Sequence, residues 1–250
     1  MSSARIFLKC LGTVIFLVMI GCGEQRKADD IKKDAPQVMV PQNSMTMPDK
    51  TLPAKVEKIL LKTLEGLSDT TFIRLADYSD DFVYDMRYAT ENNFLKAKVY
   101  DCAECYTRVK TAKALLKANK EFIEKGYKIK FFDCYRPNSV QYKMWAIVPN
   151  PQYVANPVKG SIHNKGGAVD ITLVTLAGEE LDMGTDFDFF GKRAYHDNVD
   201  LPQLILENRL LLKETMEKHG FWSIRTEWWH YNLSAGTNDK VANFKWDCPS

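Results

Sequence analysis

The stretch Ser161-Ile-His-Asn-Lys-Gly-Gly-Ala-Val-Asp-Ile-Thr-Leu-Val-Thr-Leu176 carries most of the information about how this chain folds. Its second part, residues 168–176, is apolar and rich in β-branched side chains, which predicts a buried strand. Asp170 is the only charged residue in that strand, and a pair of glycines separates it from His163. Because glycine allows a loop to approach a strand closely, we expect His163 and Asp170 to aim at one point.

Patterns on either side of this stretch predict the rest of the fold. Apolar residues at helical spacing and runs of aromatic and β-branched residues mark the elements. Helices are predicted at 109–125, 139–147 and 201–219, and strands at 72–79, 82–88, 128–133, 168–176 and 228–233. Strands and helices do not alternate regularly, which favours an α+β fold. We expect a single domain with a largely antiparallel central sheet flanked by helices.

The composition is that of a globular protein. The 250 residues are 45% hydrophobic, and 34 basic residues face 32 acidic ones, for a formal charge of +2. These values exclude wholesale disorder and a protein with many membrane spans. A charge so near zero provides no basic field for a nucleic-acid backbone, so we expect no nucleic-acid partner.

The N-terminal residues have the pattern of an export signal. Arg5 and Lys9 precede the apolar residues 10–20 and the pair Gly21-Cys22, which resembles a bacterial lipoprotein signal. That resemblance implies a signal at 1–21, lipid on Cys22, and an exported domain anchored to a bacterial membrane, either periplasmic or extracellular. A plain signal peptide and an uncleaved anchor are the alternatives. Residues 22–50 are polar and lack periodicity, which predicts a flexible tether. Residues 51–70 predict a short amphipathic helix or linker, and 71–250 the globular domain.

A second motif, Glu227-Trp-Trp-His230, supplies another imidazole. Two histidines and one carboxylate form a three-ligand zinc set that leaves one position open, where the pKa of a bound water falls to about 7. The sequence around His230 favours a strand, so a bend is needed near Glu227 for both side chains to face one site. Each motif alone also fits a coincidental pairing, so chemistry by itself leaves metal binding open.

Five motifs in order resemble the zinc D,D-peptidase superfamily, which includes hedgehog-type domains. Within it, the chain resembles the D-alanyl-D-alanine dipeptidases of the vancomycin-resistance type over about residues 72–235. Besides residues 161–170, the matching runs are Tyr84–Phe94, Asp133–Pro137, Met183–Asp188 and Glu227–Tyr231.

This resemblance implies a role for each matching residue. His163, Asp170 and His230 would bind one zinc ion per chain, and Glu227 would be the general base that activates the metal-bound water. Arg136 would stabilise the oxyanion. Tyr88 and Ser161 match positions that contact the substrate.

Simpler roles compete with these assignments. Asp170 fits a cap or an ion pair, Arg136 an exposed turn, Ser161 a local turn and Tyr88 core packing. Asp133 fits a residue that orients Arg136. Four cysteines remain after lipidation: Cys102, Cys105, Cys134 and Cys248. They allow three complete disulfide pairings, and free thiols are equally compatible with the sequence, so no pairing is predicted.

The leading hypothesis is zinc-dependent hydrolysis of the D-alanyl-D-alanine dipeptide to two D-alanines. One alternative is a D,D- or L,D-carboxypeptidase that acts on muropeptides. The other is a lipid-anchored protein that binds cell wall without catalysis. A small D,D-dipeptide and a membrane, through Cys22, are the expected partners, and the sequence predicts no oligomeric state.

Overall fold

Residues 62–248 are described by the computed structural model. The predicted signal at 1–21, the lipidated Cys22, the tether and most of the predicted helix at 51–70 lie outside the described residues. Within 62–70 the chain forms turns and irregular segments without a helix.

The main sheet has five strands in the order β2-β4-β5-β7-β6. All neighbouring strands are antiparallel except β2 and β4, which are parallel. Their bounds are Val83–Tyr84 for β2, Tyr127–Asp133 for β4, Ala168–Thr175 for β5, Phe221–Ser223 for β6 and His230–Leu233 for β7. A second sheet pairs β1 (Phe72–Arg74) with β3 (Tyr106–Arg108). The α+β class and the largely antiparallel sheet predicted from the sequence are confirmed.

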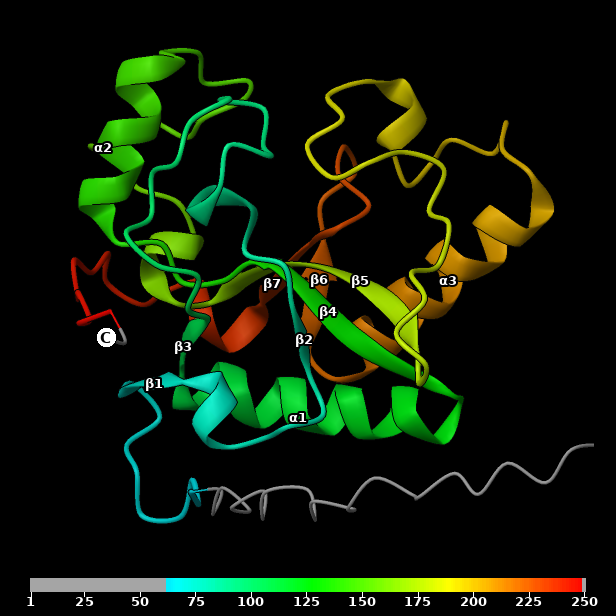
Figure 1. Ribbon diagram of the computed structural model, residues 1–250, viewed down its shortest axis with the longest axis horizontal. Coiled ribbons are helices and arrows are strands. Elements are labelled where there is room, and N and C mark those ends of the chain that lie inside the picture. The colour runs from blue at the N-terminus through cyan, green and yellow to red at the C-terminus, as the bar shows by residue number, and fades with distance from the viewer. Residues whose placement is uncertain (1–61, 249–250) are drawn as a thin grey trace, which may run out of the picture. The chain divides into compact units, whose positions relative to one another are not determined.

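In the part of the chain that the structure describes, three α-helices lie around the sheet: α1 (Val109–Glu124), α2 (Asn138–Ile147) and α3 (Gln203–Lys218). Figure 1 shows α1 below the sheet, and α2 with much of the segment between β5 and α3 above it. Helix α1 packs against β4, and α3 packs against β6. Within residues 62–248, no helix is both long and apolar enough to cross a membrane.

Short 3-10 helices account for most differences from the predicted strands. The predicted strand at 72–79 ends at Arg74 because a 3-10 turn begins at Leu75. The predicted strand at 228–233 begins only at His230, because the Glu227 carbonyl accepts the His230 backbone N–H at 3.3 Å and closes a turn. The remaining 3-10 helices are Arg87–Ala89, His163–Lys165, Lys192–Ala194 and Ser234–Gly236.

The strand register places three polar residues in one row across the sheet. Asp133 at the end of β4 pairs with Asp170 on β5, and Asp170 pairs with His230 at the start of β7. Besides Asp170, β5 is buried and apolar except for Thr172, which is buried, and Thr175 at its end, which is half-buried. Asp133 ends β4 and His230 begins β7, so the row lies at the ends of two strands. The row therefore brings functional groups to one edge of the core.

Two disulfides link the described cysteines. Cys102 is bonded to Cys248, and Cys105 to Cys134. The first closes a loop across 146 residues of sequence and the second a loop across 29. The structure thus selects one of the three pairings that the sequence left open.

Candidate active site

His163, Asp170 and His230 bring three ligand atoms together. The Oδ1 atom of Asp170 lies 2.9 Å from Nδ1 of His230 and 3.4 Å from Nε2 of His163. The two ring nitrogens are 3.2 Å apart. Ligand atoms bound at about 2.0–2.1 Å to a tetrahedral zinc ion are separated by about 3.3–3.4 Å. The spacing of the cluster therefore fits one ion of this kind.

Neighbouring residues fix the tautomers of both histidines. Nδ1 of His163 donates to the backbone carbonyl of Cys134 at 2.7 Å, so Nε2 carries the lone pair. Nε2 of His230 donates to Oδ1 of Asn232 at 3.0 Å, so Nδ1 carries the lone pair. With these tautomers, two lone pairs and a carboxylate oxygen face one another, an arrangement that a bound cation would stabilise.

Glycines allow the turn at His163 to approach β5. Gly166 has φ of +73°, a left-handed conformation that other residues rarely adopt. At Gly167 an added Cβ would lie 3.1 Å from the Cα of Gly236, so the two backbones touch. The turn that Gly166 closes leads directly into β5, and His163 lies beside Asp170, as its spacing in the sequence predicts.

Glu227 lies in the turn that leads into β7. Glu227 and His230 both line the cavity that contains the ligand atoms, so the turn supplies the predicted bend. Burial raises the pKa of Glu227 above its ordinary value. A carboxylate whose pKa is nearer to neutral is a better match for proton transfer at physiological pH.

Arg136 is held from two sides at the wall of this cavity. Its Nε and Nη2 atoms donate to Oδ2 of Asp133 at 3.1 and 2.6 Å, and Nη1 donates to Oε1 of Gln141 at 2.9 Å. Asp133 is fully buried and also accepts the Tyr100 hydroxyl at 2.6 Å. Although burial lowers the pKa of Arg136, the charge of Asp133 raises it well above its usual range, so the guanidinium stays charged. Asp133 therefore orients Arg136, and Gln141 is a further partner that the sequence did not indicate.

The cavity at the cluster has a volume of about 210 Å³. Pockets for drug-sized ligands occupy roughly 300–1,000 Å³, so this one suits a smaller molecule. Charged groups line it together with aromatic side chains, including Tyr153, Phe190 and Trp229. The Tyr153 and Phe190 rings are in contact, with centroids 4.8 Å apart. A second hollow of about 330 Å³ adjoins the first and shares Gln152, Tyr153, Phe190 and Glu227 with it.

Asp188 is a site residue to which the sequence assigned no role. It lines the cavity, and its φ of +62° is unusual for a residue other than glycine. Its carboxylate accepts the Tyr88 hydroxyl at 3.1 Å and the Phe94 backbone N–H at 3.5 Å. Burial and the nearby charge of Asp170 raise the pKa of Asp188 well above its usual value. In the sequence, only the matching run Met183–Asp188 points to Asp188. Its partner Tyr88 lies 100 residues away in the chain, so no local pattern links the two.

The two predicted substrate contacts differ in position. Ser161 lines the cavity, and its hydroxyl donates to Oδ1 of Asn164 at 3.2 Å within a local turn. Tyr88 is buried behind the wall, where its ring lies 5.2 Å from the Arg136 guanidinium and its hydroxyl contacts Asp188. The substrate contact of Ser161 stays a prediction, and Tyr88 is placed to act through Arg136 and Asp188.

The other two histidines lie outside the cluster. Nε2 of His219 contacts Glu121 at 2.9 Å between α3 and α1. Burial lowers the pKa of His196 to about 4, so it is neutral at physiological pH. Neither joins the ligand set.

Known proteins match the chain over the same region. The family model for D-ala-D-ala dipeptidases, peptidase family M15, matches residues 68–247. The chain belongs to this family. The D-alanyl-D-alanine dipeptidase of Escherichia coli (strain K12) is 33% identical over 183 residues, which are 73% of this chain and 95% of that protein. The D-alanyl-D-alanine dipeptidase of Enterococcus faecalis (strain ATCC 700802 / V583) is 32% identical over 171 residues, 60% of this chain and 85% of that protein.

A solved structure shows a weaker likeness. A mutant of the vancomycin-resistance D,D-pentapeptidase VanY in complex with Zn(II) is 16% identical, with a TM-score of 0.36. The likeness covers 54% of this chain and 75% of that chain, and at this level it adds nothing to the assignment. Family membership confirms the resemblance found in the sequence and the expectation of a metallopeptidase.

Proposed function

We propose that this protein is a zinc-dependent peptidase that hydrolyses the D-alanyl-D-alanine dipeptide to two D-alanines. The observation that carries the proposal is the convergence of His163, Asp170 and His230 beside Glu227 and Arg136 in one small cavity. Family membership supports the substrate class, since the curated relatives carry the name D-alanyl-D-alanine dipeptidase.

The residues present fit zinc as the metal. Borderline-soft Zn²⁺ accepts both imidazole and carboxylate ligands, and three protein ligands leave a position open for catalysis. When bound, zinc would supply Lewis-acid chemistry by lowering the pKa of a water and polarising the peptide carbonyl. The two histidine tautomers are already those that present lone pairs to the ion.

The protein's own groups would carry the proton and the developing charge. Glu227 would accept a proton from the attacking water and pass it to the amine that leaves. Arg136, held by Asp133 and Gln141, would donate to the oxygen that becomes negative when the carbonyl is attacked. Since both partners of Arg136 are buried, little rearrangement is needed during the reaction.

Asp188 supports a preference for a short substrate with a free amino terminus. Its carboxylate would pair with an α-ammonium group, and pairing would relieve the unfavourable burial that raises its pKa. Tyr153 and Phe190 are in contact where the cavity adjoins the second hollow, so their rings would limit how far a longer substrate could extend there. These features favour the dipeptidase over a muropeptide carboxypeptidase, and the complete set of polar groups disfavours a non-catalytic wall-binding protein.

For location, we propose export with lipid attachment at Cys22 and a tether before the domain. The Gly21-Cys22 junction after an apolar stretch motivates this proposal. Two disulfides in the domain agree with an oxidising compartment. Metabolic labelling with a fatty acid tests it: label should appear in the parent and not in the Cys22→Ala variant, and label in neither would remove the anchor.

The direct test of the activity is D-alanine release by the purified zinc-loaded chain. We expect release from D-alanyl-D-alanine and none from L-alanyl-L-alanine. A pentapeptide that ends in D-alanyl-D-alanine should be a poor substrate, and a preference for it would favour the carboxypeptidase. A chain that binds one zinc ion yet leaves the dipeptide intact would contradict the proposed substrate.

A further inference from the structure

Backbone contacts join the turn at His163 to the segment between β4 and α2. The His163 ring donates to the Cys134 carbonyl at 2.7 Å, and the Arg136 backbone N–H donates to the His163 carbonyl at 3.1 Å. The Asn164 side chain donates to the Arg136 carbonyl at 2.8 Å. The position of this short segment therefore sets both the orientation of the His163 ring and the place of Arg136.

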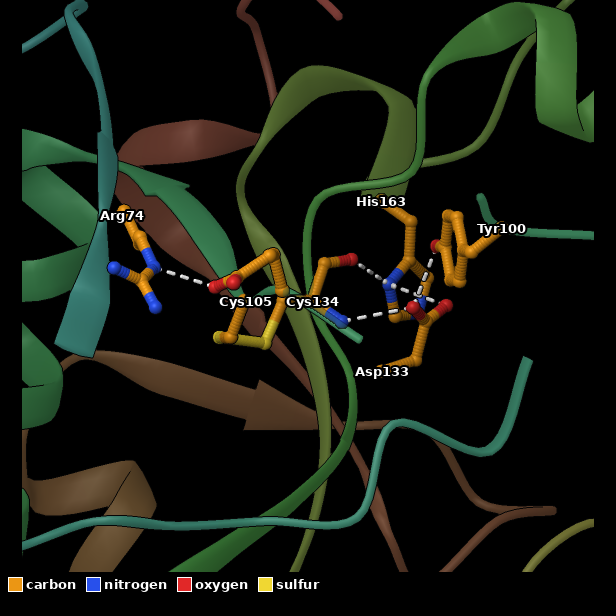
Figure 2. The surroundings of a disulfide bond; sticks show 7 residues. Arg74, Tyr100, Cys105, Asp133, Cys134 and His163 are labelled. Carbon is orange, nitrogen blue, oxygen red and sulfur yellow. Dashed lines mark hydrogen bonds and ion pairs between the residues drawn. A yellow bond between two sulfur atoms is a disulfide. The ribbon is translucent and has the colours of Figure 1, made fainter. Parts of the chain in front are cut away.

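A disulfide fastens the same segment to the second sheet. Cys134 is bonded to Cys105, the residue just before β3, and both side chains are buried. Figure 2 shows this bond on one side of Cys134, with the carbonyl of Cys134 directed to the His163 ring on the other. The next residue, Tyr135, donates its backbone N–H to the Tyr106 carbonyl at 2.9 Å. The carbonyl that orients His163 thus belongs to Cys134, the same residue that the disulfide anchors.

We infer that the Cys105–Cys134 disulfide is a positioning element of the metal site, which holds the Cys134 carbonyl where it fixes the tautomer and direction of His163. The inference rests on the proposed function, because it requires His163 to be a metal ligand. Groups that hydrogen-bond to a metal-binding histidine typically change metal affinity about 10–100-fold when they are altered. Loss of the disulfide keeps the carbonyl but loosens it, so we expect the lower end of that range.

The second disulfide provides a matched control. Cys102–Cys248 also joins two cysteines, yet neither is bonded to a residue of the ligand set. Its loop spans 146 residues against 29, and a disulfide that closes a longer loop stabilises the fold more by restricting the unfolded chain. If both disulfides acted only by stabilising the fold, loss of Cys102–Cys248 should therefore have the larger effect on both the unfolding midpoint and zinc affinity.

The experiment compares Cys105→Ala/Cys134→Ala with Cys102→Ala/Cys248→Ala in the full chain. Zinc affinity is measured by competition with a chelator at a temperature where both are folded, and the unfolding midpoint is measured without metal. We expect about 10-fold weaker zinc binding for the first variant, and unchanged binding with the larger loss of midpoint for the second. Parent-like zinc affinity in the first variant, or equal losses of affinity in both, would overturn the inference.

Two further variants keep the outcome decisive. If the first variant does not fold, Cys105→Val/Cys134→Ala fills more of the buried space and should show the same weakened binding. His163→Ala separates the two proposals. If it binds zinc as the parent does, the ligand assignment of the proposed function fails. If His163→Ala loses zinc and the disulfide variant does not, only the positioning role is wrong.

Discussion

Two walls of the same cavity are built in different ways. The metal wall consists of His163, Asp170 and His230, of which two lie opposite each other on paired strands and the third on the turn before one of them. The loop wall consists of Tyr153, Asp188 and Phe190, which lie outside the helices and strands. Sheet pairing fixes Asp170 and His230, and contacts with the Cys134–Arg136 segment fix His163. The loop wall is held by side-chain contacts and turn hydrogen bonds. We therefore expect chemistry to depend on the metal wall and its neighbours, and substrate choice to depend on the loop wall.

The largest effect should come from Glu227→Gln beside the metal wall. The amide keeps the shape of the side chain but cannot accept the proton, so kcat should fall about 10²–10⁴-fold. Zinc content should stay at the parent level because Glu227 is not in the ligand cluster. Steady-state kinetics with metal analysis checks both, and unchanged turnover would remove Glu227 from its role.

Arg136→Ala should have the next largest effect. Loss of one donor to a developing oxyanion typically lowers kcat about 10²–10³-fold. Arg136→Lys is the informative companion, because lysine keeps the charge and loses the two-pronged contact with Asp133. We expect the lysine variant to recover only part of the rate. Full activity in either variant would show that the guanidinium does not act in the reaction.

On the loop wall, Asp188→Asn should act on binding. Loss of a hydrogen bond to a charged group is worth about 1.5–3 kcal/mol, which is roughly a 10–150-fold rise in KM for the free dipeptide. An N-acetylated dipeptide lacks the ammonium group, so its KM in the parent protein should be raised by a similar factor. A larger fall in kcat than rise in KM would place Asp188 in the chemistry and erase the contrast between the walls.

The same substitution should change how stability depends on pH. The folded-state pKa of Asp188 is raised above its unfolded value, so the folded state binds more protons and loses stability as pH rises between the two values. At pH above both pKa values, the full loss of stability is present. Asp188→Asn removes it, so the midpoint of the variant relative to the parent should increase from acid to neutral pH. Thermal unfolding of the metal-free chains across that range measures this, and parallel curves would contradict the raised pKa.

The smallest effect should follow Tyr153→Ala, which opens the contact with Phe190. Tyr153 is 44% exposed, so little stability should be lost. Activity on the dipeptide should change little, while the ratio of pentapeptide to dipeptide hydrolysis should rise. Val158→Ala serves as the control, because Val158 is 81% exposed and does not line the cavity. An unchanged ratio would mean that this aromatic contact does not select substrate length.

The difference between the walls also explains what the sequence could predict. His163 and Asp170 were placed together because their spacing, the glycines and the strand pattern are all local signals. His230 required the resemblance, since its register opposite Asp170 is set by strands 60 residues apart. Asp188 lies in a segment without periodicity, and its place depends on Tyr88, which is distant in sequence. The disulfide pairing was left open for the same reason, because four cysteines have three possible pairings and only the folded chain selects one.

The metal wall is tested most directly by X-ray absorption of the zinc-loaded chain together with its metal content. The account predicts one zinc ion per chain with nitrogen and oxygen ligands at about 2.0–2.1 Å, and the loss of one such ligand in His230→Ala. Absence of stoichiometric zinc, or a ligand shell at about 2.3 Å that indicates sulfur, would contradict it.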